Sequence, residues 1–182
     1  ERIVNYLKGL NYLDDRLSSL LAPLQIPTVD EEIDHSLAPS QQQVVEAIAH
    51  HLAAVTRWQS LPRVQLLGSD RTSKQLVALS VTERFDIPLY RMRVELLPSH
   101  ASDLETLIRI WQREVQLFPV ALYLEVQAIE GGNPANSSAA AFHSFLDSSH
   151  GLFFLDVQDQ SWPMDRPTLS FEVAKPTPVE QL

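Results

Sequence analysis

The sequence has no cysteine, no long apolar run and fewer basic than acidic residues. Without cysteine there are no disulfides or thiolate metal sites, which suits a reducing cytoplasm, where we expect the protein. No apolar run approaches the roughly 18 residues that cross a bilayer, and residues 1–10 lack a signal peptide's apolar core and cleavage site. The formal net charge of −9 opposes binding to phosphate backbones. We therefore expect neither a membrane protein nor a nucleic-acid-binding protein.

An apolar fraction of 45% over 182 residues is sufficient for the core of one domain of ordinary size. The missing initial Met suggests a piece of a longer chain. Residues 1–24 carry leucines at helical spacing and predict a short helical segment; these include Leu13, Leu17, Leu20, Leu21 and Leu24. An acidic, proline-containing connector follows. We therefore divide the chain into a helical N-terminal segment with its connector, residues 1–39, and an α/β domain, residues 40–182.

From residue 40 onward, strand and helix patterns alternate. Helical spacing predicts helices over residues 40–59, 72–86, 101–118 and 136–150, with Ser40 as the N-cap of the first. Short apolar runs predict strands over residues 63–68, 87–94, 120–126, 152–157 and 168–173. This alternation is typical of βαβ crossovers, so we expect a five-stranded parallel sheet between two helical layers. Ligands of such sheets bind beyond the carboxyl ends of the strands.

The stretch "GSDRTSKQ" lies at such an end, after the first strand of the series. A phosphate-binding loop reads G-x-x-x-x-G-K-[ST], and Gly68 and Lys74 match it. Ser73 replaces the second glycine, Gln75 replaces the hydroxyl that binds Mg²⁺, and Asp70 places a negative charge where phosphates would lie. Spacing alone favours an ordinary turn between strand and helix, and a degenerate nucleotide-binding loop is the alternative.

The third and fourth strands carry further residues of interest at their carboxyl ends. Glu125 ends an apolar run in the manner of the acidic residue that holds Mg²⁺ in P-loop NTPases. The next residue is Val126, which cannot polarise an attacking water. At the end of the fourth strand, Asp156 and Gln158 stand where a polar sensor residue is expected. This pattern indicates a retained metal carboxylate and a missing catalytic base.

Almost the whole chain resembles the AAA+ ATPases, and in particular the degenerate first domain of tandem AAA+ proteins; the resemblance is carried by residues 11–24, 63–81, 87–126 and 162–182. The resemblance implies a three-layer P-loop NTPase fold with strand order 5-1-4-3-2, and a lid subdomain that would begin where this chain stops. It also implies a downstream, intact AAA+ domain, and ring-forming copies or a protein complex as partners. Some such proteins are encoded beside contractile injection systems.

By the same resemblance, Lys74 corresponds to the Walker A lysine and Glu125 to the acidic Walker B residue, with weak binding of ATP and Mg²⁺. We assign no catalytic residue. The preferred hypothesis is a non-hydrolysing AAA+ domain that supports the assembly or partner binding of a larger ATPase. Two alternatives stay open: an active ATPase domain with unorthodox motifs, and a protein-interaction module with no nucleotide role.

Overall fold

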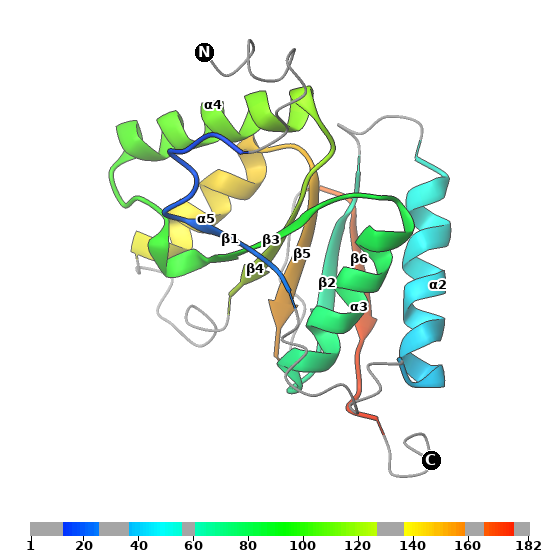
Figure 1. Ribbon diagram of the computed structural model, residues 1–182. Coiled ribbons are helices and arrows are strands. Elements are labelled where there is room, and N and C mark those ends of the chain that lie inside the picture. The colour runs from blue at the N-terminus through cyan, green and yellow to red at the C-terminus, as the bar shows by residue number, and fades with distance from the viewer. Residues whose placement is uncertain (1–12, 26–36, 56–60, 127–136, 159–165, 177–182) are drawn as a thin grey trace.

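The computed structural model describes residues 13–25, 37–55, 61–126, 137–158 and 166–176 as a six-stranded sheet with helices on both faces (Figure 1). The strands are β1 (Leu21–Pro23), β2 (Arg63–Leu67), β3 (Leu89–Arg93), β4 (Ala121–Glu125), β5 (Leu152–Val157) and β6 (Thr168–Glu172). The helices are α2 (Pro39–Ala53), α3 (Arg71–Arg84), α4 (Ala101–Leu117) and α5 (Ser137–Ser148), with a 3₁₀ turn η2 (Val94–Leu96). Among the helices of these ranges, none has both the length and the apolar character that crossing a bilayer requires.

The sheet confirms the predicted fold class and differs from the prediction in strand number. Its order is β1-β3-β4-β5-β2-β6, and the five strands from β2 to β6 are parallel to one another. Numbered along the chain, these five strands have the expected order 5-1-4-3-2. The sixth strand is β1, which pairs antiparallel with β3 at one edge through Leu21 and Met92. The prediction of five strands was therefore wrong, because it missed this edge strand.

The edge strand also corrects the prediction of a helix over the leucine-rich N-terminal segment. Residues 15–20 form turns and Leu21–Pro23 form β1. Pro23 lacks an N–H and disfavours helical backbone in the residue before it, so an edge strand suits this stretch better than a helix. Leu21 and Leu24 are both buried, but in different hydrophobic clusters, so the leucine spacing does not mark one helix face. Residues 1–12 and 26–36, with the acidic part of the connector, lie outside the described residues.

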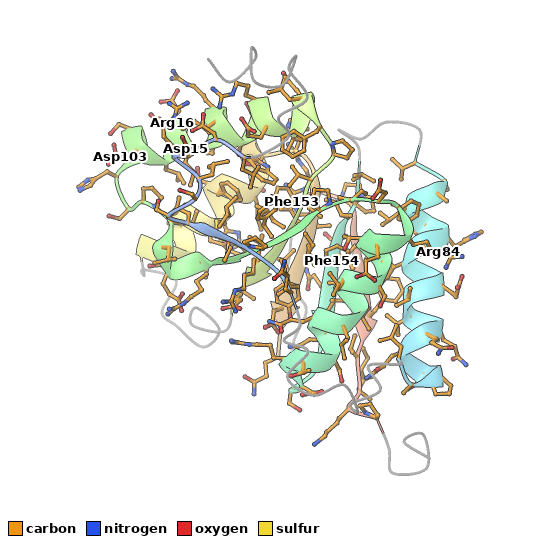
Figure 2. All side chains as sticks on the ribbon, in the orientation of Figure 1. Asp15, Arg16, Arg84, Asp103, Phe153 and Phe154 are labelled. Atoms are coloured by element: carbon orange, nitrogen blue, oxygen red, sulfur yellow. The ribbon has the colours of Figure 1, made fainter. Side chains whose placement is uncertain are left out.

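Two hydrophobic clusters fill the spaces above and below the sheet. Helices α2 and α3 cover one face and α4 and α5 cover the other (Figure 1). Neighbouring residues on a strand point to opposite faces, so Phe153 belongs to the cluster under α4 and α5, whereas Phe154 belongs to the cluster under α2 and α3 (Figure 2). Both β4 and β5 are buried along their whole lengths, and apart from Glu125 and Asp156 near their carboxyl ends their sequences are apolar without alternation.

Helix α2 begins slightly earlier than predicted and connects distant parts of the chain. Its N-cap is Ala38 rather than Ser40, because Pro39 fits the first helical position, where an N–H is not needed. The buried Gln41 side chain accepts a hydrogen bond from Ala38 N at 3.3 Å. Its amide nitrogen donates to Ser73 Oγ at 2.8 Å and to Ala174 O at 3.2 Å. Gln41 therefore fixes the start of α2 against the first turn of α3 and the segment after β6.

Candidate functional site

The connection between β2 and α3 is short, and the carboxylate of Asp70 within it hydrogen-bonds to the first turn of α3. Only Gly68, Ser69 and Asp70 lie between the last residue of β2 and the first residue of α3. Asp70 is the N-cap of α3 and accepts hydrogen bonds from Ser73 N at 3.2 Å and from Ser73 Oγ at 2.5 Å. The free N–H groups of a helix start are what a phosphate would bind. In this protein the carboxylate of Asp70 already accepts from one of them.

Gly68 is required by the close approach of two chain segments. Its φ of +136° is one that residues with a side chain rarely adopt, and a Cβ added here would lie 2.4 Å from Val173 O. Gly68 N also donates to Val157 O at 3.2 Å and to Gln158 O at 3.1 Å. The glycine that matches the phosphate-loop motif thus packs the end of β2 against the ends of β5 and β6.

Lys74 is fully buried, and its ammonium group binds three acceptors of the chain itself. It forms an ion pair with Asp156 Oδ1, and neither side chain is exposed to solvent. Lys74 Nζ also donates to Gly68 O at 2.5 Å and to Val157 O at 2.9 Å. An ammonium has three donors and no acceptor. Two acceptors from β5 and one from the turn after β2 therefore use the full hydrogen-bonding capacity of Lys74.

A second cation joins the two carboxylates at this end of the sheet. Glu125 and Asp156 are register partners on β4 and β5. Arg71, the first residue of α3, places Nε 3.3 Å from Asp156 Oδ2 and Nη1 3.7 Å from Glu125 Oε2. Burial, and then the negative charge of Asp156, raise the pKa of the Tyr123 hydroxyl far above its usual value. The cluster thus pairs two cations with two carboxylates, and Tyr123 stays neutral beside it.

The structure brings most of the predicted site residues together where the parallel strands have their carboxyl ends, which we call the carboxyl edge of the sheet; the opposite side, where these strands begin, is the amino edge. Gln75 is half-buried on α3, and Gln158 is exposed just after β5, where its main chain binds Gly68. Sequence reasoning missed Gln41, which lies 32 residues before its partner Ser73, so no local motif indicates it. Within the residues that the structure describes, no three histidine, aspartate or glutamate side chains gather as metal ligands.

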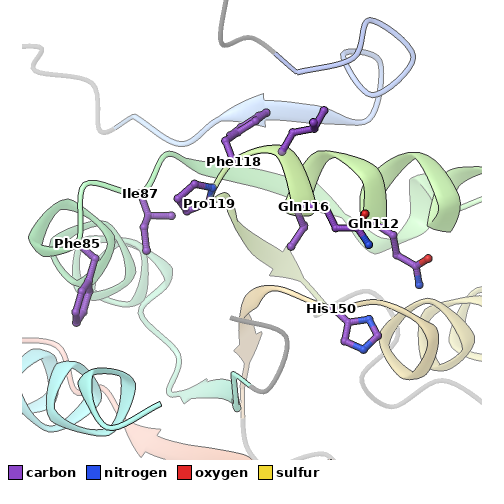
Figure 3. A pocket seen from close by; sticks show the side chains of 9 residues that line it. Phe85, Ile87, Gln112, Gln116, Phe118, Pro119 and His150 are labelled. Carbon is purple, nitrogen blue, oxygen red and sulfur yellow. The ribbon is translucent and has the colours of Figure 1, made fainter. Parts of the chain in front are cut away.

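Pockets occur at both edges of the sheet and differ in character. A pocket of about 500 Å³ adjoins the charged cluster, and its lining includes Arg71, Arg91 and Arg93. A larger pocket, of about 680 Å³, lies at the amino edge (Figure 3). Its lining residues carry no formal charge apart from what His150 acquires on protonation, and they include Phe85 and Phe118. The larger pocket is therefore remote from the charged groups, so chemistry rather than volume identifies the candidate site.

Comparison with solved structures supports the fold. The chain is similar to the AAA domain of FIGL-1, with 12% identity and a TM-score of 0.58 over 94% of this chain and 65% of that one. The same domain in complex with ADP gives 12% identity and a TM-score of 0.54, over 90% and 63% of the two chains. PCH-2 of C. elegans gives 11% identity and a TM-score of 0.56, over 89% and 50%.

These similarities show that the chain has the fold of AAA domains, as the sequence resemblance implied. The chain spans 50% to 65% of the lengths of these three solved chains. No protein-family model matches the sequence, and no curated protein matches it either.

Proposed function

We propose that this chain is a degenerate AAA+-like domain that does not hydrolyse ATP and that supports the assembly or partner binding of a larger ATPase. The observation that carries the proposal is the internal neutralisation of Lys74. In a working phosphate loop this lysine reaches the β- and γ-phosphates. In this chain it is 0% exposed and paired with Asp156, and two main-chain carbonyls take its remaining donors. The lysine thus has the role of a structural cation.

The residues around Glu125 also fit a magnesium ion poorly. Mg²⁺ requires oxygen ligands in near-octahedral geometry. Arg71 lies beside both carboxylates that would face such an ion, and an amide at Gln75 stands in place of the usual hydroxyl. The guanidinium of Arg71 therefore supplies positive charge where a metal would supply it. We derive no catalytic step through a metal at this site.

The position after Glu125 supports the absence of hydrolysis independently of the metal. Val126 is fully buried in the cluster under α4 and α5, where its side chain contributes to packing. It has no group that could orient or deprotonate a water. Each tenfold loss in rate corresponds to about 1.4 kcal/mol of lost transition-state stabilisation, so losing base and metal together removes several such factors.

A fold retained without its chemistry suits a role in assembly. The partners we propose are a downstream AAA+ domain of the same protein and further copies in a ring or a larger protein complex. A cytoplasmic location belongs to the same proposal, as does the association with contractile injection systems. An interaction module without any nucleotide role is the remaining alternative, and nucleotide titration separates the two.

The test is phosphate release from ATP and Mg²⁺ by the 182-residue chain. The chain is compared with Glu125→Gln and with a matched control, Glu105→Gln, which changes an exposed glutamate on α4. We expect all three proteins to release phosphate at the background rate. Turnover by the unmodified chain that is lost in Glu125→Gln and kept in Glu105→Gln would refute the proposal. Calorimetric titration with ATP then decides between a nucleotide-binding domain and a pure interaction module.

A further inference from the structure

The pocket beside the charged cluster gathers three arginines from two elements. Arg91 and Arg93 lie two and four residues after Leu89 on β3, and Leu89 belongs to the cluster under α2 and α3. Side chains at every second position of a strand point to the same face, so both arginines point to the face of the sheet that α2 and α3 cover. Arg71 comes from the first turn of α3. All three line the pocket of about 500 Å³, together with Glu95 and Glu125. Three guanidinium groups face two carboxylates there, so the lining has a net positive charge in a protein whose formal net charge is −9.

The three arginines differ in how far other groups of the protein already neutralise them. Arg71 is shared between Asp156 and Glu125 at 3.3 and 3.7 Å. Arg93 Nε lies 3.4 Å from Glu95 Oε2, and the Arg93 side chain is 63% exposed. Among the ion pairs of the described residues, none involves Arg91, which is exposed. Arg91 and Arg93 thus offer accessible donors to a ligand.

We infer that this pocket binds a phosphate group, either free or carried by a small molecule. Guanidinium groups bind phosphate oxygens through paired hydrogen bonds, and phosphate has enough oxygens to engage more than one arginine. A polar pocket of about 500 Å³ has the size of a small-molecule site. The exposed hydroxyl of Ser19 lines the same pocket and adds a neutral donor. This site goes beyond the proposed function, because its principal residues, Arg91 and Arg93, are not those that surround Lys74.

Removing the carboxylates that line the pocket should strengthen phosphate binding, whereas removing the arginines should weaken it. Glu95 and Glu125 compete with an incoming anion for the same guanidinium groups. Replacing a glutamate by glutamine removes this competition and lowers the repulsion of the anion. Arginine and glutamate variants of one pocket should therefore shift the affinity in opposite directions, which general damage to the fold would not do.

The experiment is calorimetric titration of the chain with pyrophosphate and with inorganic phosphate, in chelator and at low salt. We expect saturable binding of pyrophosphate that Arg91→Gln and Arg93→Gln each weaken about tenfold, which corresponds to about 1.4 kcal/mol. Glu95→Gln and Glu125→Gln should tighten it severalfold. The matched control is Arg109→Gln, an equal loss of charge at an exposed ion pair on α4, which should leave the affinity unchanged. Thermal melts of all variants check that each is folded.

Two arms identify the source of the phosphate group. ATP that binds more tightly than pyrophosphate assigns the pocket to phosphorylated small molecules, and equal affinities assign it to the free oxyanion; both results require the loss in Arg91→Gln. Pyrophosphate binding that Arg91→Gln and Arg93→Gln leave unchanged would overturn the inference, as would an equal loss in Arg109→Gln. Hexaglutamate that binds as tightly as pyrophosphate would also overturn it, in favour of an acidic peptide. None of these results depends on ATP turnover, so the inference and the proposed function can fail separately.

Discussion

Two buried cations lie at opposite edges of the same sheet, and their partners differ. Lys74 lies at the carboxyl edge and Arg63, the first residue of β2, lies at the amino edge; they are 0% and 3% exposed. Lys74 is paired with a carboxylate, Asp156. Arg63 instead donates to the carbonyls of Leu146 and Ser149 at the end of α5, and it lies 5.4 Å from the centre of the Phe153 ring.

The difference between these two sites shows that the partners of a buried cation, rather than its motif, define its role. Arg63 belongs to no motif, and it neutralises the negative end of α5. Lys74 occupies a motif position and neutralises an aspartate of its own chain. Burial, followed by the charge of the nearby Arg166, lowers the pKa of Arg63 to about 10. Arg166 itself donates to Ser149 O and Asp147 O, so it too binds the end of α5.

The largest effect should come from removing the cation at the carboxyl edge. Lys74→Met takes the ammonium partner away from the fully buried carboxylate of Asp156, whose other ion pair, with Arg71, is longer at 3.3 Å. Breaking a buried ion pair on one side typically costs about 3–5 kcal/mol of unfolding free energy. We expect a loss in that range, measured by urea denaturation. Lys175→Met, at an exposed lysine, is the control and should change stability little.

The double variant Lys74→Met/Asp156→Leu separates charge from packing. Replacing both members of a buried ion pair by apolar residues is often neutral or stabilising. We therefore expect the double variant to recover much of the stability that Lys74→Met loses. The single variant Asp156→Leu is measured as well. If the double variant loses as much unfolding free energy as the two single variants together, the pairing of Lys74 with Asp156 is not what stabilises the carboxyl edge.

The next effect should come from removing the cation at the amino edge. Arg63→Met removes one donor from each of the carbonyls of Leu146 and Ser149, which keep Ser149 N and Arg166 as donors, and it leaves no buried charge. Losing hydrogen bonds from a charged donor to carbonyls that keep a second donor costs less than leaving a buried carboxylate without its ammonium partner, so we expect a loss of about 2 kcal/mol, below that of Lys74→Met. Denaturation of both Met variants in one experiment measures the order. Arg84→Met, in an exposed ion pair with Glu46, is the control. A larger loss for Arg63→Met than for Lys74→Met would reverse the comparison.

The sequence predicted the positions of the strands well because burial on both faces leaves a strong signal. The apolar runs of β4 and β5 and the rules of βαβ connection placed Glu125 and Asp156 at one edge, and they are register partners. The order of the parallel strands, which the family resemblance implied, also agrees with the structure.

The partners of the site residues were not predictable in the same way. A motif specifies where Lys74 lies, but whether a phosphate or Asp156 neutralises it depends on distances across the sheet. Strand β1 escaped prediction because the leucines in and around it have helical spacing, although Leu21 and Leu24 are buried in two different clusters. Arg91 and Arg93 left only a weak signal, two like charges one residue apart on a strand.

Two glycines extend the comparison of the edges to the backbone. Gly68 at the carboxyl edge and Gly151 at the amino edge both have positive φ, +136° and +123°. A Cβ on Gly68 would meet Val173 O at 2.4 Å, whereas on Gly151 the nearest atom is a Val115 methyl at 3.4 Å. Backbone strain of this kind costs about 1–3 kcal/mol. We expect both alanine variants to lose stability in denaturation, and Gly68→Ala to lose more. Equal losses of stability would show that the positive φ alone is responsible and that the contact of the added Cβ with Val173 O contributes nothing.

The smallest expected effect is on the pH dependence of the unfolding free energy, and it comes from His150 at the amino edge. Burial, and then the charges of Arg166 and Arg63, lower the pKa of His150 in the folded protein below its usual 6.5. As the pH falls below about 6.5 the unfolded chain therefore binds this proton first, and the stability of the folded state decreases. Measured as unfolding free energy against pH, this decrease should be smaller in His150→Gln. It should also be smaller in Arg63→Met, which removes one of the cations that lower the pKa. An unchanged slope in His150→Gln would show that other groups of the chain set the pH dependence in this range.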